Sequence, residues 1–153
     1  MIRPHLIVLQ VLLVLVGCAT YQTQVTDVRE LARRHAWEEA LKGIEPLAHE
    51  DSKDQLAFLL DYASLLQMAG RYKESNEALH AADKMSEVKD YHSLSKITAS
   101  LLLTEEMVQY KGDDFEKVLI NGVNAFNFLM TNDLDGALVE VRRLNNKLYR
   151  YKF

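Results

Sequence analysis

The chain has 153 residues and a formal net charge of −4, because 22 acidic side chains outnumber 18 lysines and arginines. This balance argues against a basic surface for phosphates, so we expect no nucleic-acid partner. A single cysteine excludes an internal disulfide and a metal site built from several cysteines, so the fold must depend on its apolar core.

A short apolar segment opens the chain. Residues 6–16 are apolar apart from Gln10, follow Arg3 and end at the small residue Gly17. Eleven residues rise about 16 Å as a helix, roughly half of the length that crosses a bilayer. We therefore expect the apolar region of a signal peptide rather than a spanning helix. A secretory peptide or a buried helix that stops at a cysteine by coincidence is the alternative.

The run Leu15-Val16-Gly17-Cys18 resembles the lipobox of bacterial lipoproteins. The resemblance implies that the thiol of Cys18 carries a fatty acid such as palmitate and that Cys18 becomes the new amino terminus. Residues 1–17 would be the signal peptide and 18–24 the lipid anchor with a short linker. The domain at 25–153 would then be held to a membrane by lipid chains. Ala19 favours the outer membrane in organisms that retain lipoproteins with aspartate at that position.

The remaining 136 residues are predicted to be all-α. Their only proline is Pro46, good helix formers dominate, and no stretch alternates between apolar and polar residues. Apolar residues recur instead at helical spacing, as in the stripe Leu56, Leu59, Leu60, Ala63 and Leu66.

The helices also repeat. Steps of 3, 7, 9, 12, 16 and 19 residues select similar residue types from three starting points, as follows: Val28, Leu31, His35, Trp37, Ala40, Ile44, Leu47; Ala63, Leu66, Gly70, Tyr72, Ser75, Leu79, Ala82; Ala125, Phe128, Asn132, Leu134, Ala137, Val141, Leu144. The third member of each series is expected to end a helix in the left-handed conformation, which Gly and Asn suit better than His. The fifth member is small, as a close helix crossing requires.

This spacing resembles the tetratricopeptide repeat, a helical hairpin of about 34 residues that stacks into a solenoid. We expect about three degenerate repeats, with an extra helix over Tyr91–Tyr110 and a turn at residues 112–114 where an aspartate caps the next helix. A generic helical bundle is the alternative. The segments 110–119, 125–129 and 137–143 also resemble a poorly characterised family of longer bacterial lipoproteins with such helices, which implies a surface or periplasmic lipoprotein that is either short or incomplete.

Solenoids of this kind bind through the inner face of their first helices. The pattern predicts a partner-binding groove lined by Arg29, Arg33, Gln67, Met68, Phe126, Leu129 and Met130. The two arginines could hold a carboxylate, or they could be solvated and paired with Glu30 or Glu38. The last three residues could contact a partner, or they could be internal core.

No catalytic or metal-ligand pattern stands out. The histidines are scattered without HExxH spacing, and there is no phosphate loop or GxSxG motif. We expect no enzyme activity, no cofactor and no metal. The sequence favours an outer-membrane-anchored periplasmic scaffold that binds an envelope protein or peptide segment during assembly of an envelope complex. An envelope enzyme or a helical domain that binds a small ligand or the cell wall is the alternative.

Overall fold

The computed structural model describes residues 21–96 and 110–152, except for the side chains of residues 89–96. These residues form helices without any strand, which confirms the all-α prediction for the described ranges. The helices are α2 (Tyr21–Gln24), α3 (Thr26–Arg33), α4 (Trp37–His49), α5 (Gln55–Met68), α6 (Tyr72–Lys96), α7 (Asp114–Met130) and α8 (Leu134–Tyr151). Cys18 and the predicted signal peptide lie outside the described residues.

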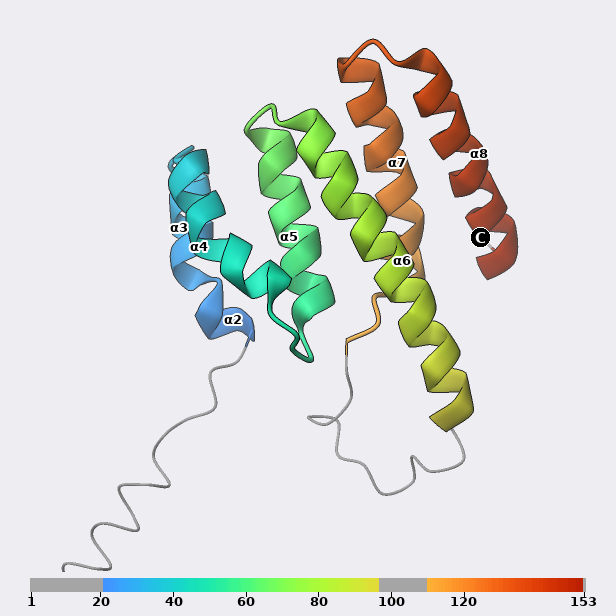
Figure 1. Cartoon of the computed structure of the whole chain (residues 1–153), viewed down its shortest axis with the longest axis horizontal. Coiled ribbons are helices and arrows are strands. Elements are labelled where there is room, and N and C mark those ends of the chain that lie inside the picture. The colour runs from blue at the N-terminus through green and yellow to red at the C-terminus, as the bar shows by residue number, and fades with distance from the viewer. Residues whose placement is uncertain (1–20, 97–109, 153) are drawn as a thin grey trace, which may run out of the picture.

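Consecutive helices pack against one another from α3 to α8. In Figure 1, α3 and α4 lie at one end of a row, α5, α6 and α7 follow, and α8 lies at the other end. The apolar core is centred on α4, α5 and the first half of α6, where Ile44, Leu56 and Leu66 are fully buried. No helix in the described part of the chain is both long enough and apolar enough to span a bilayer.

Three of the turns between helices are alike. His35, Gly70 and Asn132 have φ angles of +60°, +76° and +58°, and each follows the helix that the sequence series places before it. The amide of each bonds three residues back, and the next amide bonds five residues back, to Leu31, Leu66 and Phe128. This pair of bonds satisfies the last carbonyls of a helix. The prediction of left-handed helix ends at these three positions is confirmed, including at His35.

The small residues of the series lie where the second helix of each pair is buried. Ala40, Ser75 and Ala137 have almost no exposed surface. The hydroxyl of Ser75 donates a hydrogen bond to the backbone carbonyl of Ala63 at 2.8 Å, which shows that α6 approaches the backbone of α5 closely. Three helical hairpins, α3–α4, α5–α6 and α7–α8, therefore share one turn and one type of buried small residue.

The expected extra helix over Tyr91–Tyr110 is wrong in part. Residues 91–96 are the end of α6, which runs on from Tyr72, and Tyr110 is not helical. The reason is that residues 72–96 contain neither glycine nor proline to stop the helix. Residues 97–109 lie outside the described part.

The predicted aspartate cap is confirmed. Gly112 has a φ angle of +79°, Asp113 is the N-cap of α7, and the Glu116 carboxylate accepts the backbone N–H of Asp113 at 2.7 Å. This is the reciprocal arrangement of a capping box.

Within the segment predicted to be an anchor and linker, residues 21–24 form α2. The hydroxyl of Tyr21 donates to the Asp61 carboxylate at 2.5 Å, and its ring lies 5.2 Å from that of Phe58. The packed part of the chain therefore begins at or before Tyr21, only three residues after Cys18.

Candidate interaction surface

The residues predicted to line a groove lie on α3, α5 and α7, the first helices of the three hairpins. Arg29, Ser64 and Phe126 occupy equivalent positions in the series, and so do Arg33, Met68 and Met130. All six are exposed. We call this set the first-helix face.

The two arginines of the first-helix face do not share a partner. Arg29 donates to the Gln22 side chain at 2.5 Å and lies over the ring of Tyr21, at 5.6 Å from its centre. Arg33 lies 3.4 Å from the carboxylate of Glu30, as one of the two expected alternatives has it. Such an exposed pair contributes at most about 1 kcal/mol, so Arg33 can exchange this carboxylate for that of a ligand.

Gln67 has a structural bond rather than an open side chain. Its amide donates to the Asn127 carbonyl oxygen at 2.9 Å, and the Asn127 amide donates to the hydroxyl of Ser75 at 2.9 Å. This chain joins α5, α6 and α7 through a buried side chain. Of the predicted groove residues, Gln67 is thus the one tied to the interior.

The end of α7 is apolar on the outside. Phe126, Leu129 and Met130 are each about half exposed, and Met68 on α5 is 60% exposed. These side chains are not core of the described part of the chain. Because water contact with apolar surface costs free energy, a cluster of this kind marks a contact surface more often than chance would.

The side of α7 that faces the protein is unusually polar. Asn121, Asn124 and Asn127 are fully buried, at spacings of three residues. Neither polar atom of the Asn124 side chain has a hydrogen-bond partner, and the Asn121 carbonyl oxygen also lacks one. A buried amide atom without a partner costs about 1–3 kcal/mol. The i, i+3, i+6 asparagines were a visible signal in the sequence, but a search for apolar periodicity ignores them.

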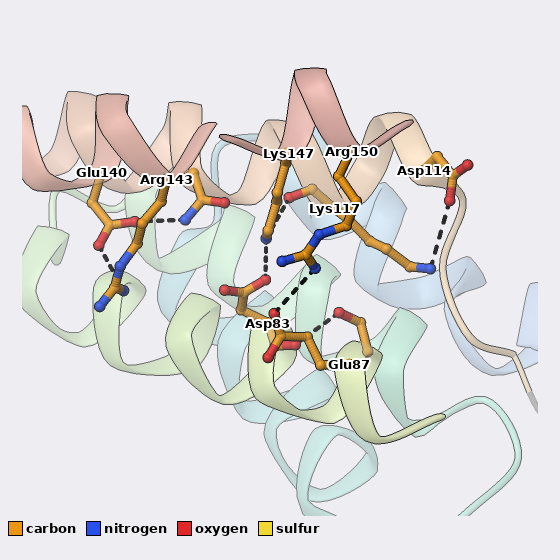
Figure 2. A network of polar contacts seen from close by, with 10 residues as sticks. Asp83, Glu87, Asp114, Lys117, Glu140, Arg143, Lys147 and Arg150 are labelled. Carbon is orange, nitrogen blue, oxygen red and sulfur yellow. Dashed lines mark hydrogen bonds and ion pairs between the residues drawn. The ribbon is translucent and has the colours of Figure 1, made fainter. Parts of the chain in front are cut away.

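Buried charges connect α6, α7 and α8. Figure 2 shows Lys147 on α8 reaching the Asp83 carboxylate of α6, and the same ammonium group donates to the backbone carbonyl of Lys117 at 2.9 Å. Glu140 accepts from Asn121 at 2.7 Å and from Arg143 at 3.0 Å. These groups are paired within the fold, so the network holds the last hairpin in place and offers no open group for catalysis.

A second polar contact lies near the start of the packed chain. Burial raises the pKa of the Asp61 carboxyl above its ordinary value, and this effect outweighs the hydrogen bond from Tyr21 and the charge of Arg29, which lower it. Burial and the Asp61 carboxylate also raise the pKa of the Tyr21 hydroxyl. The Tyr21 hydroxyl is therefore protonated at neutral pH and acts as a donor.

Among the described residues, no three His, Cys, Asp or Glu side chains lie close enough together to hold a metal ion. What the described part defines is an all-helical stack of hairpins with a partly apolar outer surface. In comparisons with known proteins, no protein-family model, curated protein or solved structure matches the chain.

Proposed function

We propose that the protein is a lipid-anchored lipoprotein of the bacterial envelope, in which a tetratricopeptide-like stack of helical hairpins binds an envelope protein or peptide during assembly of a larger complex. The observation that carries the proposal is the apolar part of the first-helix face, Met68, Phe126, Leu129 and Met130, which remains exposed although α7 has buried asparagines on its other side.

The tetratricopeptide-like part of the proposal is supported by the repetition of geometry. Three hairpins have a left-handed residue at the same place in the turn and a buried small residue five positions later, at spacings of 35 and 62 residues. Repeats of this type stack because one hairpin cannot bury its apolar face alone. The contacts between consecutive helices fit this stacking.

The anchor part of the proposal is supported by the lipobox-like run and by its distance from the fold. Tyr21 packs on Phe58 and Asp61, and only three residues separate it from Cys18. Three extended residues span at most about 11 Å. A lipid on Cys18 would therefore hold α2 and the neighbouring Arg29 close to the membrane surface, and Ala19 favours the outer membrane.

The anchor is tested by mass spectrometry of the chain extracted from membranes. We expect a mass that matches loss of residues 1–17 and addition of acyl chains to Cys18. Cys18→Ser should abolish the added mass and leave the chain uncleaved. An unmodified thiol on Cys18 in the native protein would overturn the anchor.

The scaffold is tested with the full chain purified together with its bound proteins. We expect one envelope protein to copurify and to be lost from the double variant Phe126→Asp with Met130→Asp. Val139→Asp is the matched control, because Val139 is a half-exposed apolar residue on α8, away from the first-helix face. Circular dichroism must show that all variants keep their helices. A chain that has no protein partner but turns over a cell-wall substrate would overturn the scaffold.

A further inference from the structure

The second helix of each hairpin has an outer face, and the repeat shows what covers it. Three positions of the series family are equivalent at spacings of 35 and 62 residues: Leu41, Ile44 and Ala48 on α4; Asn76, Leu79 and Asp83 on α6; Leu138, Val141 and Asn145 on α8. On α4 all three are buried beneath the following hairpin, and on α6 Asn76 and Leu79 are buried while Asp83 pairs with Lys147 of α8.

The same positions on α8 are open. Leu138 and Val141 are 45% and 50% exposed, and Asn145 is exposed as well. Leu134 and Tyr149 extend the row by one turn at each end and are even more exposed. We call Leu134, Leu138, Val141, Asn145 and Tyr149 the end face. At 100° per residue these five lie within an arc of about 80°, so they form one stripe along α8.

The end face is therefore a stacking interface in the two preceding hairpins and an exposed apolar stripe in the last one. It is separate from the first-helix face, which is exposed in all three hairpins. The continuity of the repeat indicates that the end face takes a helix packed along α8, because a helix occupies this place on α4 and on α6.

The charges along α8 indicate which helix this is. The helix starts with Asp133 and Asp135 and ends with Arg150 and Lys152. When two such helices pack antiparallel, the acidic start of each lies beside the basic end of the other, and their dipoles are also opposed. Arg150 has only a loose, exposed contact with Glu87 at 3.8 Å, so it can turn to a new carboxylate.

We propose that the end face binds the end face of a second copy of this chain, with the two α8 helices antiparallel about a two-fold axis beside Val141. The stripe is self-complementary in this arrangement. Leu134 lies opposite Tyr149 of the second copy, Leu138 opposite Asn145, and Val141 next to the axis. Each residue pair then occurs twice, as an isologous dimer requires.

Disulfide cross-linking in native membranes tests the proposal with the full chain. Val141→Cys places two thiols beside the two-fold axis, within the separation of Cα atoms that a disulfide bridges, about 4.4–6.8 Å. Mild oxidation is expected to give a band of twice the mass of one chain, which a reductant removes. Val139→Cys is the matched control, because Val139 is 43% exposed on the same helix but points about 160° away from Val141. It should give at least about 10-fold less dimer, the margin that a two-residue change of helix side provides.

The experiment is repeated with Cys18→Ser in every variant. The dimer band then depends on α8 alone, so failure of the proposed lipid anchor and failure of the dimer are told apart. A band of equal strength from Val139→Cys, or none from Val141→Cys, would overturn the proposal. A cross-linked band that contains a different protein would also overturn it, because the end face would then have another occupant.

The antiparallel direction is tested by charge reversal in the Val141→Cys background. Asp133→Lys with Asp135→Lys should lower the yield of dimer several-fold, since four bases would then meet at each end. Adding Arg150→Glu and Lys152→Glu should restore the yield. Restoration is the result that a mere folding defect would not give, and a yield that stays low after both reversals contradicts the antiparallel arrangement.

Discussion

The side-chain amide of Asn127 donates a hydrogen bond to the hydroxyl of Ser75 at 2.9 Å and so connects α7 to α6. The same hydroxyl donates to the carbonyl of Ala63 on α5. In the other two hairpins the position of Ser75 is taken by Ala40 and Ala137. One hydroxyl therefore gives the middle hairpin polar bonds to both sides, where its neighbours have only a methyl group.

Ser75→Ala should lower the free energy of unfolding by about 1–3 kcal/mol, because it leaves the buried Asn127 amide with an unpaired hydrogen. Urea denaturation followed by circular dichroism measures the change. Ser64→Ala is the matched control, since Ser64 is an exposed helical serine bonded to its own helix, and it should change the value by about 0.5 kcal/mol or less. Equal effects of the two variants would contradict the role given to Ser75.

Lys147→Ala should cost about 3–5 kcal/mol, because it leaves the largely buried Asp83 carboxylate without its cation. Arg150→Ala on the same helix removes an exposed contact with Glu87 and should cost about 1 kcal/mol or less. The double variant Lys147→Met with Asp83→Leu should recover most of the loss, since no charge stays buried. A double variant as unstable as Lys147→Ala would show that the network of Figure 2 contributes more than charge pairing.

Gly70→Ala should destabilise the chain by about 1–2 kcal/mol, because the φ angle of +76° strains any residue with a Cβ atom. The strain is purely of the backbone, since no atom lies within 4 Å of where that Cβ would be. Gly70→Asn should cost less, because asparagine tolerates this conformation and Asn132 adopts it in the last hairpin. Thermal unfolding of the two variants ranks them, and a less stable asparagine variant would contradict the equivalence of the turns.

The free energy of unfolding should depend on pH through Asp61. Its pKa is raised in the folded chain, so the folded state holds this proton more tightly than the unfolded state, and stability falls as the pH rises above about 4, the ordinary carboxyl value. The loss is complete once the pH exceeds the raised pKa. Asp61→Asn should remove this part of the decline, and Tyr21→Phe should enlarge it, because the Tyr21 bond lowers that pKa. Urea denaturation from pH 4 to pH 7 tests both, and three equal slopes would contradict the assignment.

The hairpins and their turns could be predicted because their signals are local. A left-handed helix end and a small crossing residue each leave a mark at fixed spacing, so His35, Gly70 and Asn132 were found from the sequence alone. The length of α6 was not, because aromatic residues near Tyr91 resemble the start of a new helix and no breaker separates them from Tyr72.

The polar interior could not be predicted. Lys147 and Asp83 are 64 residues apart, and no pattern in the sequence pairs them. Lysine and glutamate usually lie at the surface, so Lys117, Glu140 and Lys147 were expected there rather than between α6, α7 and α8. The exposure of Phe126 and Met130 was predicted as one of two alternatives, and only the packing of α7 against α6 and α8 decided between partner-facing surface and internal core.

The most direct test of the scaffold is photo-cross-linking in living cells with a photoreactive phenylalanine analogue in place of Phe126. The account predicts one discrete cross-linked product that contains an envelope protein, together with much weaker cross-linking when the analogue replaces Val139. A product that contains this chain alone, or the same set of products from both positions, would contradict it.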